Sequence, residues 1–415
     1  MTSRSTPWHR SSPRCVAPSV ASRRRASHDV TASPVLPRGF RAHVASVGIK
    51  DTTDDLAIVD ARRPVAAAAV FTRSRFSGPS VDLSRHNVAS ASAQAVVIVS
   101  KNANVANGDA GRRDAAELCA LTAAAVGCEP GDVLVASTGV IGRRYPIDRL
   151  RSGIGDATDF TAAPIDVARA MMTTDTVAKV EHAVVAGSDA VIVGMAKGVG
   201  MIEPDMATHI SLILTDADMP ADELDAVFRR VVDRTFNCVS IDTDTSTSDT
   251  SIALASGTAG AVDHAAFEQA LDDVMRALTK AIARDGEGAN SLIEVHVDRA
   301  RDVDQARRVG KAIVNSPLVR TAVHGGDPNW GRVAMAIGKC SDDTDIDQHR
   351  VVIRFGTDEV YPRLLDDDAL AELSDYMRGA DVLIHVSLDT GTAEATVWGC
   401  DLSDTYVRFN ADYTT

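Results

Sequence analysis

The stretch GMAKGVGMIEPDMATH, residues 194–209, decides how the rest of the chain is interpreted. An apolar run, residues 190–193, precedes it, and an alternating apolar run, residues 209–214, follows it. Both flanking runs are typical of β-strands. The stretch is therefore expected to connect two strands of a sheet.

The composition of this connection differs from that of an ordinary hairpin. Gly198 and Gly200 permit positive φ and close backbone approach, and Pro204 disfavours helical geometry at the residue before it. Thr208 is consequently expected where a constrained loop enters a strand. Threonine is also common at strand starts because its β-branched side chain is stiff, so the position alone does not make it catalytic.

A hydroxyl at Thr208 could attack the carbonyl of Ala207 and cleave the chain through an ester. The new N-terminal threonine would carry a nucleophilic hydroxyl and an α-amine with a reference pKa of about 7.7–8.0, which suits a general base. Lys197 would add a positive charge nearby.

The segment KGVGMIEPDMAT, residues 197–208, resembles the self-cleavage segment of the ornithine acetyltransferases, also called glutamate N-acetyltransferases or arginine-biosynthesis bifunctional proteins. The likeness extends over residues 36–415, and several segments are most similar to the copies found in clavulanic-acid gene clusters. The resemblance implies cleavage between Ala207 and Thr208, with Thr208 as the nucleophile of both self-cleavage and acetyl transfer.

A second motif, STGVIG at residues 137–142, follows the predicted strand 133–136. Glycine after threonine lets a backbone N–H point into a cleft, where it could stabilise a developing oxyanion. By itself such a turn is ordinary. The resemblance assigns an oxyanion hole to Thr138, through its hydroxyl, and to Gly139, through its N–H.

Other polar segments have ordinary structural interpretations beside functional ones. The hydroxyls of residues 173–176 could cap a helix, the acid in DGEG at 285–288 could be solvated, and the C-terminal tail could be frayed. In the related family these segments contact substrate, and the tail folds back over the site. The substrate-binding residues implied by the resemblance are Thr174, Lys197, Thr208, Glu287, Asn410 and Thr415.

Residues 240–250 are also mostly acidic and hydroxyl residues, but this run lacks the central glycine and terminal glutamate of an EF-hand. We expect a hydrogen-bonded turn near the active site there. The six cysteines and eleven histidines are scattered without metal-ligand spacing, so we expect no zinc site, no other metal and no cofactor.

Overall composition limits the class of protein. The net charge is −14, and the acids are spread along the chain, which disfavours nucleic acid and anionic membranes as partners. No apolar run approaches the roughly 20 residues of a membrane span. Scattered cysteines suit a reducing compartment, so a cytoplasmic location is expected.

Residues 1–35 are rich in arginine and serine and hold few acids, so they are expected to be disordered. An upstream start codon or an organelle transit peptide would each explain them, and we favour the start codon. The remaining chain is expected to divide into residues 36–207, the α fragment of a catalytic domain; 208–291, which begins the β fragment and completes that domain; and 292–415, a smaller α/β part.

Sequence patterns support a mixed α/β protein, and the resemblance implies an N-terminal-nucleophile-like αββα sandwich. The implied activity is ping-pong transfer of acetyl from N2-acetylornithine to glutamate by a heterotetramer of two α and two β fragments. Use of acetyl-CoA stays open, as does the choice between arginine biosynthesis and a specialised gene-cluster pathway. An N-terminal-threonine amidase or aminopeptidase of related fold is the main alternative, and an uncleaved binding protein is disfavoured.

Overall fold

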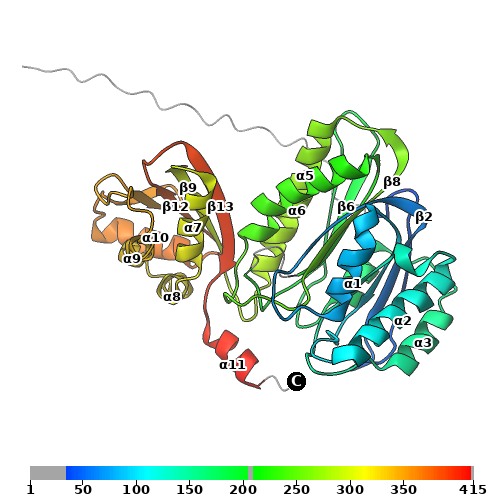
Figure 1. Ribbon diagram of the computed structural model, residues 1–415. Helices are drawn as coiled ribbons and strands as arrows, with labels where there is room; N and C mark the ends of the chain where they lie inside the picture. The colour runs from blue at the N-terminus through cyan, green and yellow to red at the C-terminus, as the bar shows by residue number, and fades with distance from the viewer. Residues whose placement is uncertain (1–33, 204–208, 413–415) are drawn as a thin grey trace, which may run out of the picture. The chain divides into compact units, whose positions relative to one another are not determined.

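The computed structural model describes residues 34–203 and 209–412, and residues 34–415 form one compact unit. Two sheets organise it (Figure 1). The larger has eight strands, in the order β4-β3-β2-β8-β7-β6-β5 with β1 paired to β2. These strands are β1 Arg41–Ala45, β2 Leu56–Phe71, β3 Ser92–Val99, β4 Val133–Ser137, β5 Lys179–Val184, β6 Val191–Lys197, β7 Ile210–Asp218 and β8 Thr250–Ala261.

Strand β2 joins the two halves of this sheet. Its first residues, 56–60, pair with β1 and β3, whereas residues 66–71 pair with β8. A register irregularity between Asp60 and Val65 separates these parts, and Arg62 there has a φ of 62°. Pro64 lies in this interval and has no N–H to donate, which suits a bulge. The apolar runs at 57–59 and 65–71 predict two separate strands, but the structure has one bent strand that contains both.

Helices cover both outer faces of the folded sheet. The helices α1 Pro79–Asn87, α2 Gly108–Val126 and α3 Ile147–Gly155 lie on the β3–β4 half, while α5 Ala221–Arg234 and α6 His264–Arg284 lie on the other half (Figure 1). A separate buried cluster joins inward residues of both halves to α4 Pro164–Met171. The predicted αββα layering is confirmed, with its two β layers formed by one continuous sheet.

The smaller sheet contains five strands in the order β11-β10-β12-β9-β13. Its central strands β9 and β12 run parallel, and α7 packs against β9 and β13. The elements are β9 Leu292–Ala300, α7 Val303–Val314, α8 Pro317–Gly325, α9 Trp330–Gly338, β10 Val352–Phe355, β11 Asp358–Tyr361, α10 Asp367–Met377, β12 Asp381–Ser387 and β13 Ala393–Cys400. This is the smaller α/β part expected from the sequence.

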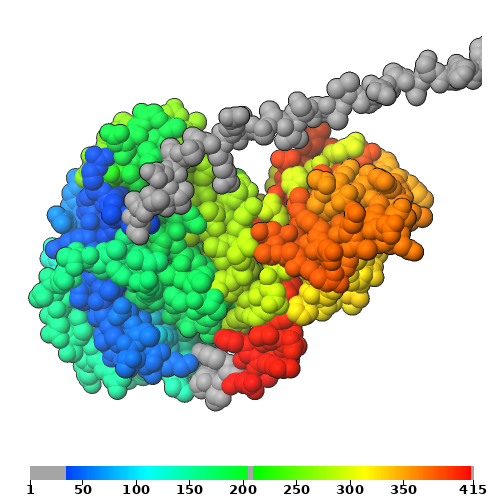
Figure 2. Space-filling model, turned by 180° about the vertical axis from the view of Figure 1, so that it is seen from behind, coloured from blue at the N-terminus to red at the C-terminus, as the bar shows by residue number. Residues whose placement is uncertain are grey.

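The last helix, α11 Asp404–Asp412, has no buried residue and forms the red ridge on the surface in Figure 2. In the part of the chain that the model describes, no helix combines the length and apolarity needed to cross a membrane.

Strand ends determine where polar side chains converge. Strands β6 and β7 are antiparallel, with Lys197 opposite Ile210, and β7 runs parallel to β8 from the same end. The parallel pair β3 and β4 brings Val99 beside Ser137 in the same way. Two strands are present as predicted, but β6 extends to Lys197, so the first four residues of the stretch 194–209 belong to the strand and not to the connection.

Candidate active site

Six of the predicted site residues line one cavity of about 320 Å³. It lies where β4, β6 and α6 end and β7 and β8 begin, with residues of α11 on its wall. The lining residues are Thr138, Gly139, Val140, Ile141, Thr173, Thr174, Lys197, Gly200, Met201, His209, Ile210, residues 246–249, Glu287, Phe409 and Asn410. A larger cavity of about 790 Å³ along β2 and α5 contains none of the predicted site residues.

The remaining predicted positions, Ala207, Thr208 and Thr415, lie outside the described residues. His209, the first described residue after the gap at 204–208, lines the cavity.

Gly139 holds a conformation that other residues rarely adopt. Its φ is 127°, and an added Cβ would lie 2.2 Å from the carbonyl carbon of Lys101 and 2.5 Å from the nitrogen of Asn102. The adjacent N–H groups of Thr138 and Val140 donate to the carbonyls of Val99 and Lys101, at 3.0 and 3.4 Å. The turn is therefore fixed against residues 99–102, and it requires glycine.

Lys197 is the cation of the cavity. Its side-chain nitrogen lies 3.5 Å from the hydroxyl oxygen of Thr138, and the residue is buried, with 8% of its surface exposed. Burial lowers the pKa of Lys197, although the carboxylate of Asp175 opposes this shift. Lys197 and Thr138 thus place two donors beside each other.

Behind Lys197, a buried ion-pair network fixes the strand end. Lys179 contacts Asp175 at 2.8 Å and Asp285 at 2.6 Å, and all three side chains are at most 6% exposed. Asp175 also accepts a hydrogen bond of 2.7 Å from the N–H of Gly198. Burial favours the neutral acid, yet Lys197 and Lys179 hold the pKa of Asp175 below its usual value. The sequence analysis did not identify these positioning residues.

Glu287 supplies a carboxylate to the same cavity. Its two oxygens accept hydrogen bonds from the hydroxyl of Thr174, at 2.9 Å, and from the side-chain amide of Asn410, at 3.0 Å. Burial raises the pKa of Glu287, and these two donors oppose the rise. A Cβ on Gly200 would lie 2.7 Å from this carboxyl group, so glycine makes room for it. Three predicted substrate contacts therefore form one hydrogen-bonded unit.

The acidic run 240–250 packs against the loop after β6, as expected. The carboxylate of Asp242 accepts hydrogen bonds from the N–H groups of Met201, at 2.6 Å, and Ile202, at 2.7 Å. Asp242 therefore anchors the backbone of residues 201–202, which precede the segment 204–208.

Two buried titratable groups on the cavity wall were also missed. Burial raises the pKa of Asp249 well above its usual range, and its Oδ2 has no hydrogen-bond partner within the described residues. Burial, together with the charge of Lys197, lowers the pKa of His209 to about 3. His209 is therefore neutral, and its ring packs edge-on to Phe236 at 4.0 Å between ring centroids.

The arrangement combines a cation, a carboxylate and candidate oxyanion donors around a small cavity. A site with both charges suits an amino-acid ligand, which carries an ammonium and a carboxylate itself. The donors of Thr138 and Gly139 suit a reaction in which a carbonyl oxygen gains negative charge.

Comparison with known proteins agrees with this chemistry. Residues 41–415 match the model of the ArgJ family. Glutamate N-acetyltransferase Oat2 of Streptomyces clavuligerus is 54% identical over 392 residues, covering 92% of this chain and 99% of that protein. Arginine biosynthesis bifunctional protein ArgJ 2 of Nostoc sp. is 52% identical over 381 residues, covering 91% and 98%.

Among solved structures, the arginine biosynthesis bifunctional protein of Bacillus halodurans is 38% identical, with a TM-score of 0.45 over 48% of this chain and 96% of that one. The ornithine acetyltransferase of Mycobacterium tuberculosis, solved with ornithine, is 33% identical, with a TM-score of 0.36 over 41% and 94%.

Proposed function

Because the chain belongs to the ArgJ family and is an acyltransferase, we propose that it transfers the acetyl group of N2-acetyl-L-ornithine to L-glutamate in arginine biosynthesis. The observation that carries this proposal is the position of Lys197, 3.5 Å from Thr138, in the same cavity as the carboxylate of Glu287. Both substrates have an α-carboxylate for the cation to bind.

Thr208 is the proposed nucleophile. Its hydroxyl attacks the acetyl carbonyl, and the N–H of Gly139 and hydroxyl of Thr138 stabilise the oxyanion. The amide C–N bond then breaks, the ornithine amine takes the proton, and the acetyl group remains on Thr208 as an ester. In the second half-reaction the amine of glutamate attacks this ester, and N-acetylglutamate leaves with the threonine hydroxyl restored. The α-amine of Thr208 would move the protons.

This mechanism requires cleavage between Ala207 and Thr208, which frees that amine. It also predicts that Asn410 and Thr415 reach the substrate from the tail. Asn410 already donates to Glu287, at 3.0 Å, which supports a role for α11 in closing the cavity. Assembly as two α and two β fragments and a cytoplasmic location remain predictions.

Intact-mass spectrometry and an acetyl-transfer assay test the proposal together. Purified wild-type protein should show two fragments that meet at the bond between Ala207 and Thr208, and Thr208→Ala should remain one chain. With N2-acetylornithine and glutamate, wild type should form ornithine and N-acetylglutamate in equal amounts. A single full-length mass for active enzyme would refute self-cleavage. Free acetate in place of N-acetylglutamate would instead identify a hydrolase of the amidase class.

A further inference from the structure

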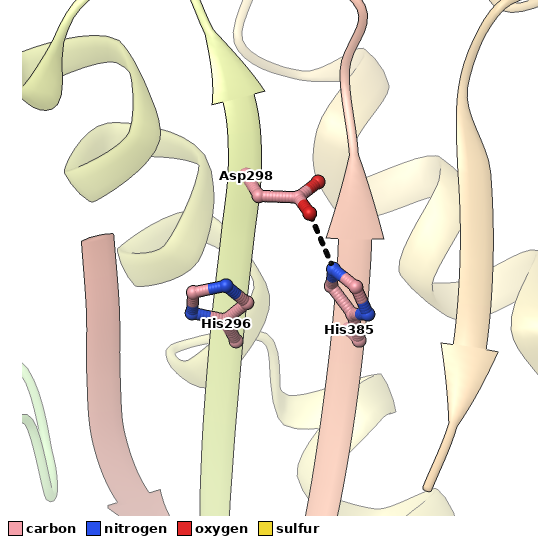
Figure 3. Close-up of side chains that lie close together, drawn as sticks. All are labelled: His296, Asp298 and His385. Carbon is pink, nitrogen blue, oxygen red and sulfur yellow. Dashed lines mark ion pairs between the residues drawn. The ribbon is translucent and has the colours of Figure 1, made fainter. Parts of the chain in front are cut away.

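A cluster of two histidines and an aspartate lies on the smaller sheet. His296 and Asp298 are two residues apart on β9, so their side chains share one face of the sheet. His385 on the parallel strand β12 is directly opposite His296. Figure 3 shows the three side chains together on these neighbouring strands. None of them lines the cavity of the proposed active site.

The distances within the cluster suit shared coordination of a metal ion. One candidate ligand atom from each side chain lies within 4.8 Å of the other two. Nε2 of His385 is 3.0 Å from Oδ2 of Asp298, and the two imidazole centroids are 5.1 Å apart. Only small side-chain rotations would be needed to reach metal–ligand distances of roughly 2.0–2.2 Å.

Burial and hydrogen bonding indicate that these polar atoms lack a full set of partners. Each of the three side chains is between 24% and 29% exposed. Oδ1 of Asp298 is buried without a hydrogen-bond partner within the described residues, whereas Nε2 of His385 is buried and contacts the other carboxylate oxygen of Asp298 at 3.0 Å. Buried polar groups normally find a partner, and a bound cation would provide one for Oδ1 of Asp298 while the histidine nitrogens coordinate it.

Neighbouring side chains orient the cluster. The hydroxyl of Thr396, directly opposite His296 on β13, lies 3.1 Å from Nδ1 of that histidine and leaves its Nε2 available as a ligand. Contacts of this kind fix ring orientation in metal sites. Glu394 is 4.0 Å from Nε2 of His296 and has 71% of its side chain exposed, so it is free to rotate toward the cluster.

The cation on the neighbouring strand β10 is already engaged. Arg354 lies opposite His385 on β10, donates to the hydroxyl of Ser387 at 3.3 Å, and pairs with Glu359 at 3.8 Å. Its charge is therefore partly neutralised by Glu359.

We propose that His296, Asp298 and His385 bind a divalent transition-metal ion of the zinc type, with Glu394 as a fourth ligand. Two imidazoles favour zinc over magnesium and calcium, which prefer oxygen ligands. The ion would link β9, β12 and β13, and would therefore stabilise this sheet. The sequence analysis expected no zinc site because the ligands lie far apart along the chain, and only the pairing of β9 with β12 brings them together.

Zinc binding to the tag-free full-length protein, stripped with a chelator and studied by isothermal titration calorimetry, tests this site. We expect one zinc equivalent, a higher melting temperature with zinc, and visible absorption bands of a low-symmetry complex with cobalt(II). His385→Asn should weaken zinc binding at least 100-fold and abolish the melting shift. Thr396→Val, which removes only the orienting hydroxyl, should weaken binding by about 10- to 100-fold.

The exposed His349 provides the matched control, since His349→Asn should bind zinc as wild type does. Melting curves of each variant without metal will show whether it is folded, and Asp298→Asn replaces His385→Asn if the latter is not. Equal zinc affinity in wild type and the folded ligand variants would overturn the proposal. Failure of wild type to bind zinc at millimolar concentration would overturn it as well.

Discussion

Replacing Lys197 by methionine removes the only cation that lines the cavity among the described residues, while it retains most of the side-chain volume. We expect weaker binding of both N2-acetylornithine and glutamate, because the α-carboxylate is the group they share. Lys197 is 8% exposed, so water screens its charge little. A hydrogen bond to a charged group contributes about 1.5–3 kcal/mol, which corresponds to a rise in KM of roughly 10- to 150-fold for each substrate.

Lys179→Met is the matched control for this experiment. Lys179 is 1% exposed and pairs with Asp175 and Asp285 at 2.8 and 2.6 Å, so its loss leaves two buried carboxylates without their cation. Breaking a buried ion pair in this way costs about 3–5 kcal/mol of the free energy of unfolding. Lys197→Met should therefore weaken binding with little change in the urea midpoint, whereas Lys179→Met should lower the urea midpoint strongly.

The pH dependence of kcat/KM distinguishes the charge of Lys197 from its packing. Burial lowers the pKa of Lys197, so its charge is present at low pH and is lost as pH rises through that lowered value. As pH rises, wild type should consequently lose substrate affinity at a pH below the usual pKa of a lysine side chain, and Lys197→Met should not show this loss.

The same positive charge would keep the Thr208 amine deprotonated, so the limb on which activity rises with pH should move to higher pH in Lys197→Met. Separate assays of ornithine release and N-acetylglutamate formation give both KM values. A loss of affinity for one substrate alone, with an unmoved pH profile, would refute the role assigned to Lys197.

Four further outcomes are expected. Thr138→Ala should lower kcat by about 10²- to 10³-fold with little change in KM, whereas Thr138→Ser should retain most of the wild-type kcat. An unchanged kcat of Thr138→Ala in steady-state assays would show that Thr138 has only a structural role. Gly139→Ala should lower kcat at least as much, because its Cβ would lie 2.2 Å from the backbone of Lys101, and circular dichroism will check that the variant is folded. Burial lowers the pKa of His209 to about 3, below the 6.5 of an exposed histidine. The contribution of His209 to the free energy of unfolding is therefore fully present above pH 6.5 and is lost as pH falls below that value. In wild type the free energy of unfolding, measured with urea, should be higher at pH 7 than at pH 5, and His209→Leu should reduce this difference by about 2 kcal/mol. An unchanged difference would contradict a buried neutral histidine. Burial raises the pKa of Cys119 to about 12, so mass mapping after native alkylation should find Cys119 unmodified, and labelling before unfolding would contradict its burial.

Hydrophobic periodicity was sufficient to predict the long elements. The apolar spacing of residues 264–283 predicts a helix, and α6 His264–Arg284 buries this apolar stripe, while the carboxylate of Asp263 caps its first turn. By contrast, α1 Pro79–Asn87 was not predicted, because it is polar and buries Ser80, Val81 and Ser84. The hydroxyl of Ser84 donates to the carbonyl of Val135 and accepts from its N–H. A helix that is stabilised by such a tertiary contact lacks the helical spacing of apolar residues from which a helix is predicted.

The residues of the site also differ in whether the sequence identifies them: some belong to short motifs, and others are brought together only by the fold. The residues placed in the cavity by resemblance, such as Thr138 and Glu287, belong to recognisable short motifs. Lys179 lies outside these motifs, and one of its two carboxylate partners, Asp285, lies 106 residues beyond it. The need for a buried counter-charge beside Lys197 becomes evident only when its burial is known.

The approach to the proposed cleavage bond is held by residues that follow that bond in the chain. Asp242 anchors the N–H groups of Met201 and Ile202, and the N–H of Glu203 donates to the carbonyl of Asp244 at 2.9 Å. The side chain of Glu203 accepts a hydrogen bond of 2.7 Å from Asn315, so the smaller α/β part also contributes. A strained geometry at Ala207 would need these contacts, and they exist only after both segments have folded. Cleavage should therefore follow folding: Asp242→Ala should slow it, and chain kept in urea should stay intact by mass, whereas equal cleavage rates in urea and in buffer would show that the folded loop is not required.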